Sequence, residues 1–567
     1  MKNKLHLLSI IAIMSIAGCA SNKTSSTQSS SATSQESSEQ TSSSKESSLE
    51  SSEQTSSSKE ESSKEDSSEE LSSEQSSSKE ESSEQISSEE ESSEQISSEE
   101  ESSEDSSSEE TKGDAPVDFT YSNQDYLDYF NHGNKVEVTI NIKNDVIYHL
   151  AQYGVSYFDQ QEMYHPCDVV IKINDEIRFE GEEVGLRMKG NTSKNPNFVD
   201  ENGHFNGYSH FKMSFKETFN DELDNDYYAH DWSEDAAGLK ARKKRKFGGM
   251  KKVDFKWNRN YDNTFTKEAY SKYIYRDAGV VAQNVNLIKL TINTESDSFS
   301  DIYQTFECVD GNMLEKYYGA DGGEGNLYKG LYARADLTTD SIKGNNLNPE
   351  SSYNTNPTYP LKTNDDGPEY DHTLMKNFVD LINTKNISGN DMQTYLKESM
   401  EVDSVIRYCA LAWVVGNPDD LRNNANNTYF YFNSYNDRFS IIPYDDDRCF
   451  GILKDWPVDM STLPADSTRM GGMSFNQGGK VWINNPLLWR IVCEDTSHQD
   501  YPLVEAFNEL YKTYVEEFAT KYLDVDLFRS FTEGFYYAPS KDINNAGDSN
   551  MTFATYAENK LNNMFKA

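Results

Sequence analysis

A run of acidic and carboxamide residues stands between two apolar stretches in the second half of the chain. It reads Gly416-Asn417-Pro418-Asp419-Asp420, followed by Asn423, Asn424, Asn426 and Asn427. A second acidic run, Tyr444-Asp445-Asp446-Asp447, comes soon after it. Carboxylate and carboxamide oxygens are hard ligands that suit Mg²⁺ or Mn²⁺ carrying phosphate oxygens.

Two apolar segments between these runs predict a pair of strands, Thr428–Phe432 and Arg438–Pro443, joined by a turn. If the strands are antiparallel, the residues that enter the first and leave the second lie at the same end of the hairpin. We therefore expect four side chains to converge there: Asp419, Asn427, Asp445 and Asp447. Phosphoryl transfer of the kinase type needs such a set, with one Asp to orient a hydroxyl and an Asn and an Asp to hold metal. An acidic surface loop and a structural Ca²⁺ site are the alternatives.

The first half of the chain is rich in strand patterns. Residues 136–142 alternate between apolar and polar side chains, and Asn174-Asp175 predicts a hairpin turn between two further strands, Val169–Ile173 and Ile177–Phe179. Strands are also expected at Val184–Lys189, His210–Phe215, Met250–Trp257, Ile288–Ile292 and Ile302–Glu307. One helix, Thr264–Ala278, crosses this region and ends at Gly279.

Helical periodicity dominates the second half. Helices are expected at Asp371–Thr384, Asp403–Val415, Pro486–Cys493 and Leu503–Tyr522. The Gly-rich run Gly319–Gly325 predicts a loop, as does the basic run Lys240–Lys246, for which docking of an acidic protein is the second interpretation. The fold class is therefore α+β, with a β-rich N-lobe over residues 113–310 and a mostly helical C-lobe over residues 311–567.

The N-terminus has the features of a secretory signal over residues 1–19. Lys2 and Lys4 precede an apolar run that is too short to span a membrane, and it ends in Ile16-Ala17-Gly18-Cys19. These four residues resemble a bacterial lipobox, in which Cys19 carries the lipid. The expected location is extracytoplasmic, at the cell surface, with a lipid anchor in the membrane. An ordinary secretory peptide is the alternative.

A Ser/Glu-rich tether, residues 20–112, is predicted to be disordered. Residues 20–110 contain 26 acidic residues and five lysines, a net charge of −21 out of −43 for the whole chain. A segment with so few apolar residues cannot recover its ordering entropy by burial. It is either a spacer or a set of phosphorylation substrates, because its serines are flanked by glutamates.

The charge balance and the cysteines limit the partners and the covalent cross-links that can be expected. The acidic balance argues against a nucleic-acid partner, which needs clustered Lys and Arg to neutralise phosphates. Five cysteines follow the tether, with no C-x-x-C pair, so buried reduced thiols are expected: Cys167, Cys308, Cys409, Cys449 and Cys493.

Several short motifs occur in an order that resembles the CotH kinase family, the atypical kinase-like proteins named for a spore-coat protein. They are Gly185-Leu186-Arg187-Met188-Lys189-Gly190-Asn191-Thr192-Ser193, Thr266-Lys267-Glu268-Ala269-Tyr270, Arg276-Asp277-Ala278-Gly279, Asn326-Leu327-Tyr328-Lys329, Gly416-Asn417-Pro418-Asp419, Asn427-Thr428-Tyr429-Phe430-Tyr431, and Ile442-Pro443-Tyr444-Asp445-Asp446-Asp447 with Gly451. The resemblance covers most of residues 135–520. It implies a two-lobed, kinase-like fold that binds ATP and Mg²⁺ (or Mn²⁺) and phosphorylates Ser or Thr of protein substrates.

The resemblance also implies roles for individual residues. Asp419 matches the catalytic-loop Asp, and Asn427, Asp445 and Asp447 match metal-binding positions. Glu268 matches a helix glutamate that pairs with a lysine binding the nucleotide, and three lysines are candidates for that pair: Lys189, Lys212 and Lys256. The turn that contains Lys189, Asn191 and Ser193 would cover the phosphates.

Two rival functions remain open. One is a non-catalytic surface adhesin or carbohydrate-binding protein on the same fold, suggested by the expected location and by 35 tyrosines. The other is a Ca²⁺-stabilised hydrolase that uses paired Asp residues.

Overall fold

The computed structural model describes most of the chain beyond the tether. The described ranges are 112–153, 163–190, 192–220, 228–331, 334–344, 346–347, 357–363, 371–454, 456, 459–466, 485–492 and 499–565. Residues 1–111, where the signal peptide, Cys19 and most of the tether are expected, lie outside these ranges. All the described residues belong to one compact unit, Glu104–Ala567.

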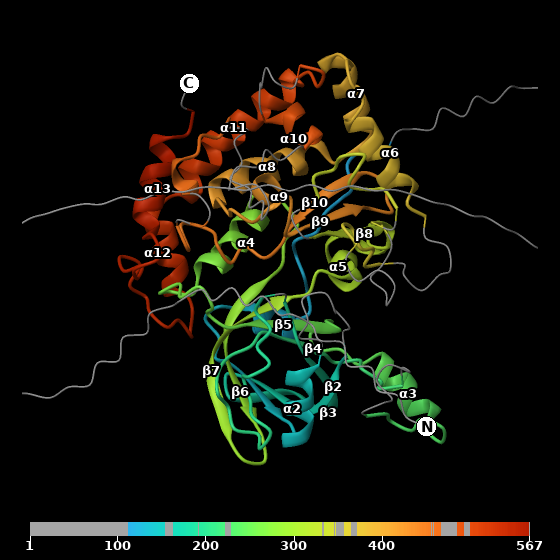
Figure 1. The fold of residues 1–567 in the computed structure, drawn as a ribbon, viewed down its shortest axis with the longest axis vertical. Coiled ribbons are helices and arrows are strands. Elements are labelled where there is room, and N and C mark those ends of the chain that lie inside the picture. Colours follow the sequence, from blue (N-terminus) through green and yellow to red (C-terminus); the bar gives the residue numbers. More distant parts are fainter. Residues whose placement is uncertain are drawn as a thin grey trace, which may run out of the picture. The chain divides into compact units, whose positions relative to one another are not determined.

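Strands β1 to β7 close into a barrel in the order β1-β2-β3-β4-β5-β7-β6. Figure 1 shows the barrel in the lower part of the view. The barrel closes through β1 and β6, which pair in parallel, whereas the other neighbours are antiparallel. The strands are β1 Val136–Asn141, β2 His165–Ile173, β3 Glu176–Met188, β4 Phe211–Ser214, β5 Lys252–Lys256, β6 Val285–Asn293 and β7 Ser298–Glu307. Alternating apolar side chains from these strands fill the barrel interior.

The hairpin between β2 and β3 confirms the turn expected from the sequence. Asn174 and Asp175 both have positive φ, at 50° and 68°, as the two central residues of a tight hairpin turn require. Val184–Lys189, expected as a separate strand, is instead largely the second half of β3. A register shift between Cys167 and Val169 of β2 lets one strand continue through this region.

A second, three-stranded sheet has the order β10-β9-β8 and lies among helices. The strands are β8 Asn326–Gly330, β9 Thr428–Phe432 and β10 Phe439–Pro443. Every residue of β9 and β10 is buried, and their antiparallel pairing sets Thr428 opposite Pro443. The prediction that both acidic runs meet at one end of this hairpin is confirmed.

The helices before this sheet are α1 Gln124–Phe130, α2 Asn144–Gln152, α3 Ala236–Lys243, α4 Lys267–Asp277 and α5 Gly311–Gly322. Those after β8 are α6 Thr373–Ile382, α7 Gly389–Ser399, α8 Val402–Val415, α9 Leu421–Asn424, α10 Pro486–Ile491, α11 Glu505–Tyr522, α12 Val525–Glu533 and α13 Phe553–Asn562, with a 3₁₀ turn at Met460–Thr462. Helix α4 contacts both β6 and α8, and so connects the barrel to the helical part (Figure 1).

Three expectations about loops and helices were wrong. Among the described residues of the region 113–310 there are three helices besides α4, because short amphipathic segments such as α2 pack against the barrel strands. Gly319 and Gly322 belong to helix α5, which is kinked at Gly319. The basic run, expected as a solvated loop, is helical up to Lys243 and is attached to the barrel by Arg242 and Arg245.

The α+β class is confirmed, and so is the state of the cysteines within the described residues. Cys167, Cys308, Cys409 and Cys449 are buried thiols that form no disulfide bond, while Cys493 lies outside the described ranges. None of the described helices combines the length and the apolar character needed to cross a bilayer.

Candidate active site

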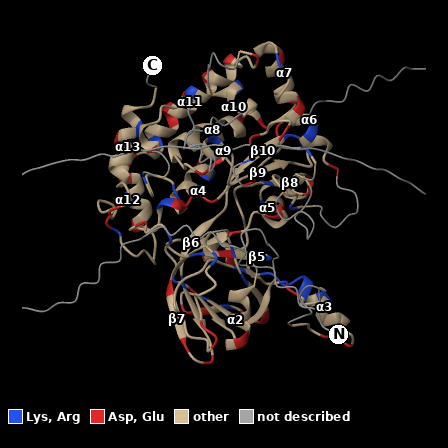
Figure 2. Cartoon of the chain, in the orientation of Figure 1, with Lys and Arg blue, Asp and Glu red and all other residues tan. Residues whose placement is uncertain are grey.

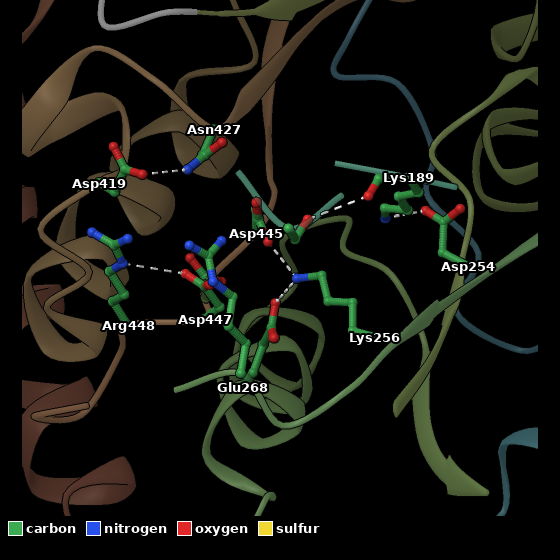
Figure 3. A network of polar contacts seen from close by, with 12 residues as sticks. Lys189, Asp254, Lys256, Glu268, Asp419, Asn427, Asp445, Asp447 and Arg448 are labelled. Carbon is green, nitrogen blue, oxygen red and sulfur yellow. Dashed lines mark hydrogen bonds and ion pairs between the residues drawn. The ribbon is translucent and has the colours of Figure 1, made fainter. Parts of the chain in front are cut away.

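Lys256, the last residue of β5, links the barrel to two acidic side chains, one from helix α4 and one from the loop after β10. Its Nζ donates a hydrogen bond to Glu268 Oε1 at 2.6 Å and another to Asp445 (Figure 3). Lys256 and Glu268 are each only 4% exposed. Burial by itself would lower the pKa of Lys256, but the carboxylates of Asp445 and Glu268 outweigh it and raise that pKa well above its usual value.

The three lysines proposed as partners of Glu268 are thereby distinguished. Lys189 pairs with Asp254 of β5, and Lys212 Nζ lies 3.6 Å from the other oxygen of the same carboxylate. Among the described residues, Lys256 is the lysine that pairs with Glu268. Lys189 and Lys212 thus form a second ion cluster beside the first, and Figure 3 shows the Lys189–Asp254 pair next to Lys256.

The turn that follows β3 is only partly described. Ser193 Oγ donates a hydrogen bond to the carbonyl of Lys189 at 3.3 Å, which closes the turn. Gly190 has φ of 91°, and a Cβ there would lie 2.0 Å from Ser193 Oγ, so this turn requires glycine. Asn191 lies outside the described residues.

Asp445 follows β10 in an unusual backbone conformation. Its φ of 51° is in the left-handed region, which residues other than glycine rarely adopt. The partial removal of its carboxyl group from water would raise the pKa of Asp445, but the charge of Lys256 outweighs this and lowers it. Asp445 is therefore ionised at neutral pH.

Asp447 lies close to Asp445 and is affected by its charge. Burial, and then the Asp445 carboxylate, raise the pKa of Asp447 to about 7. Asn260 donates Nδ2 to Asp447 Oδ2 at 3.0 Å, and Arg448 Nε lies 3.8 Å from Oδ1. Two neighbouring carboxylates at a half-buried position repel each other, and a bound divalent cation would relieve that repulsion.

Asp419 is held by the carboxamides that crowd this part of the sequence. Its Oδ2 accepts from Asn427 at 3.1 Å, and its Oδ1 accepts from Asn424 at 2.5 Å and from Asn426 at 3.1 Å. Asn423 belongs to another group, since it donates to Asp420. Burial raises the pKa of Asp419, which makes the carboxylate a better proton acceptor than an exposed one.

Sequence reasoning missed a buried group behind the site. Asp446, between the two predicted ligands, accepts from Lys272 at 2.7 Å, Ser271 at 3.0 Å and Asn417 at 3.1 Å. Lys272 is four residues after Glu268, and this spacing places the two side chains on one face of α4. This four-residue spacing is the feature of the sequence that could have indicated a second ion pair from α4. Helix α4 thus holds the barrel through Glu268 and the acidic loop through Lys272.

Asn260 and Arg448 were missed for a different reason, because neither stands in a recognisable pattern. Asn260 reaches Asp447 from the loop after β5, and Arg448 stacks on the Trp456 ring at 3.2 Å from its centroid. Only the folded loops bring these groups to the acidic residues.

A pocket that is open to solvent lies beside Lys256. Its walls include His210, Arg259, Asn260, Glu268 and Asp447. Cationic, amide and carboxylate groups therefore face the same space, which suits an anionic ligand accompanied by a cation. Within the described residues, no group of three or more His, Cys, Asp or Glu side chains is arranged as a ready metal site, so any cation would also need amide, water or ligand oxygens.

Comparison with known proteins identifies the family of the chain. No curated protein matches the chain. The family model described as CotH kinase protein matches residues 204–533, more than half of the chain and all of the elements that carry Lys256, Glu268, Asp419 and Asp445. The chain is therefore a member of the CotH kinase family.

Proposed function

We propose that this protein is a protein Ser/Thr kinase with a two-lobed, kinase-like fold that uses ATP and Mg²⁺ or Mn²⁺. The observation that carries the proposal is the bridge from Lys256 to both Glu268 and Asp445, with Asp419 on the facing loop. Such a bridge joins a barrel strand, a helix and a metal-binding loop, as a kinase requires. On this proposal the barrel is the N-lobe, and the helices around β8–β10 are the C-lobe.

Different residues of the chain would bind the nucleotide and the metal ion. Lys256, held by Glu268, would neutralise phosphate charge, and the pocket beside it would receive the nucleotide. Asp445 and Asp447 would hold the metal ion together with the carbonyl oxygen of Asn427, whose amide nitrogen is used by Asp419. The metal ion, when bound, draws negative charge from the transferred phosphoryl group.

Asp419 would orient the acceptor and take its proton. In the transfer, the acceptor Ser Oγ forms a bond to the γ-phosphorus, the bond from that phosphorus to the bridging oxygen breaks, and ADP leaves. The hydroxyl proton passes to Asp419, whose raised pKa suits a base. The amides of Asn424, Asn426 and Asn427 keep the carboxylate in place.

We further propose that the protein is anchored through Cys19 outside the cytoplasm, and that the serines of its own tether are among its substrates. The lipobox-like end of the signal and the density of Ser next to Glu support this. No nucleic-acid partner is proposed.

The direct test is phosphate transfer by the full-length protein. Incubation with ATP and Mg²⁺, followed by mapping of phosphosites by mass spectrometry, should show phosphoserine in the tether and in added acceptor proteins. Asp419→Ala should reduce the signal at least 100-fold, the size expected for loss of a general base. Asp380→Ala, the same change on the exposed face of α6, is the matched control. Equal, negligible transfer by the wild type and by Asp419→Ala would contradict the proposal.

Nucleotide binding separates the kinase from an adhesin on the same fold. ATP with Mg²⁺ at 100 times its dissociation constant should stabilise the protein by about 2.7 kcal/mol and raise its melting temperature. Asp445→Ala should abolish the rise. Stabilisation by a sugar but not by nucleotide would favour the adhesin, and stabilisation by Ca²⁺ alone would favour the hydrolase.

A further inference from the structure

The segment around α3 is fastened to the barrel by its two arginines. Arg242 Nη2 donates to Glu183 Oε2 at 2.8 Å, and its Nη1 donates to the Glu183 carbonyl at 3.0 Å. Arg245 donates to the carbonyl oxygens of Glu182 at 2.7 Å and Glu183 at 2.9 Å. With both arginines directed at the barrel, the lysines between and beside them are left facing outward.

These lysines and two neighbours form what we name the α3 basic surface. It consists of Lys216, Lys240, Lys243, Lys244, Lys246 and Lys251. The four on residues 240–246 are exposed, and no ion pair to a described acidic residue holds any of the six. Figure 2 shows the concentration of Lys and Arg along α3, whereas acidic residues prevail over the chain as a whole.

The positive charges on this surface repel one another. The strand partners explain their proximity, since the Phe215 amide bonds to the Lys251 carbonyl and Phe247 pairs with Met250. Burial, and then the charges of Lys252 and Lys251, lower the pKa of Lys216. An anionic partner would remove this repulsion.

The same chain contains a strongly acidic segment, whose charge is opposite to that of the α3 basic surface. Residues 20–110 carry 26 acidic residues and five lysines, whereas residues 111–567 have a net charge of −24. The chain is attached to the folded unit where this segment ends, because Lys112 Nζ donates to the Tyr435 carbonyl at 2.7 Å and Asp114 pairs with Arg438 at 2.8 Å. Ninety residues have a contour length of roughly 300 Å, enough to reach any point of the unit.

We propose that the α3 basic surface binds the acidic Ser/Glu segment, residues 20–110, of the same chain. Covalent linkage gives the segment an effective concentration in the millimolar range, so that individually weak ion pairs suffice. The contact is electrostatic and weakens as salt shortens the screening length from about 10 Å at 0.1 M to about 3 Å at 1 M. It does not rest on the proposed kinase activity. If the tether serines are phosphorylated, each phosphate adds about −1.5 to −2 charges and tightens the contact.

Carbodiimide cross-linking of the full-length protein tests the contact directly and needs no nucleotide. This zero-length reagent joins a carboxylate to an amine with which it is in contact, and mass spectrometry identifies the pair. At 20 mM NaCl we expect links from glutamates of residues 36–110 to lysines of the α3 basic surface, falling at least fivefold at 0.5 M NaCl. A mixture of ¹⁴N- and ¹⁵N-labelled protein should give links within one chain only.

Two variants, each with four lysines replaced, test whether the contact depends on the α3 basic surface. Cleavage by a Glu-specific protease is the second measurement. The test variant changes Lys to Gln at Lys240, Lys243, Lys244 and Lys246, and the control changes Lys to Gln at the exposed residues Lys143, Lys376, Lys397 and Lys512. Cleavage within residues 36–110 at low salt should be several-fold faster in the test variant than in the wild type, and unchanged in the control.

Three cross-linking results would overturn the proposal. One is an absence of links from residues 20–110 to the α3 basic surface. The second is links only between different chains. The third is that the linked carboxylates belong instead to acidic residues outside residues 20–110, such as Asp221, Glu222, Asp224 and Asp226, which precede α3 in the sequence. Equal cleavage of the test variant and the wild type would contradict it as well. A failure of phosphate transfer would leave all these measurements unaffected.

Discussion

Among single residues, Lys256 neutralises two carboxylates at once, those of the buried Glu268 and the partly exposed Asp445. Lys256→Met keeps much of the side-chain volume but leaves Glu268 charged and unpaired. We expect a loss of about 3–5 kcal/mol in the free energy of unfolding, measured with urea at pH 7. Lys289→Met, at a lysine whose side chain is 46% exposed and 3.9 Å from Glu137, should cost less than about 1 kcal/mol. A cost below 1 kcal/mol for Lys256→Met would show that the pair is not maintained in solution.

Asp420 is the residue whose titration should affect stability near neutral pH. It is 3% exposed, its Oδ2 has no hydrogen-bond partner, and burial raises its pKa to about 7. The charges of Asp446 and Arg422 affect the pKa of Asp420, and the charge of Asp420 in turn affects the pKa of Lys560. Because the folded state holds this proton more tightly than the unfolded state, stability falls as the pH rises from about 4 to 7.

Asp420→Asn should remove that part of the pH dependence. Asn keeps the acceptor for the Asn423 amide and cannot ionise. The decrease in unfolding free energy between pH 5 and pH 8 should therefore be about 2–3 kcal/mol smaller in the variant than in the wild type. Urea unfolding at the two pH values measures it. An identical pH dependence in both proteins would mean that Asp420 is ionised throughout.

At the level of elements, the end of α8 determines where the acidic loop begins. Gly416 ends the helix with φ of 59° and ψ of 47°, and a Cβ there would lie 2.1 Å from the buried Tyr556 hydroxyl oxygen. Gly416→Ala should cost about 1–3 kcal/mol in urea unfolding, because it combines backbone strain with this clash. Gly311→Ala in α5, where no atom lies within 4 Å of the new Cβ, should stay within about 0.5 kcal/mol. Equal costs for the two would contradict this explanation.

The elements also show which parts of the structure were readable from the sequence. Alternating side chains, the Asn174-Asp175 turn and the periodicity of α4 are local signals, and each was sufficient. The parallel pairing of β1 with β6 that closes the barrel joins segments about 150 residues apart, and no local pattern records it. For the same reason, the sequence did not show which of the three candidate lysines pairs with Glu268. Only the register of β4 against β5, which sets Lys212 opposite Asp254, leaves Lys256 for Glu268.

For the whole molecule, the last helices complete the support of α4, although the family match ends at residue 533. Tyr270 of α4 is buried against Phe528 of α12 and Phe553 of α13, with ring centroids 5.2 and 5.7 Å from its own. Lys267, at the start of α4, donates to the carbonyl oxygens of Phe450 and Met551. The C-terminal helices therefore hold the helix that positions Glu268.

Phe553→Ala tests this dependence of the site on the end of the chain. Phe553 is fully buried and stacks on Phe528 at 4.1 Å, so its truncation should cost about 3–5 kcal/mol in urea unfolding. Leu561→Ala on the same helix, at a side chain that is 44% exposed, should stay within about 0.5 kcal/mol. Because α4 packs on this cluster, nucleotide-dependent stabilisation should also weaken in Phe553→Ala under conditions where the variant is still folded. Full stabilisation by nucleotide in that variant would mean that α4 keeps Glu268 in place without the C-terminal helices.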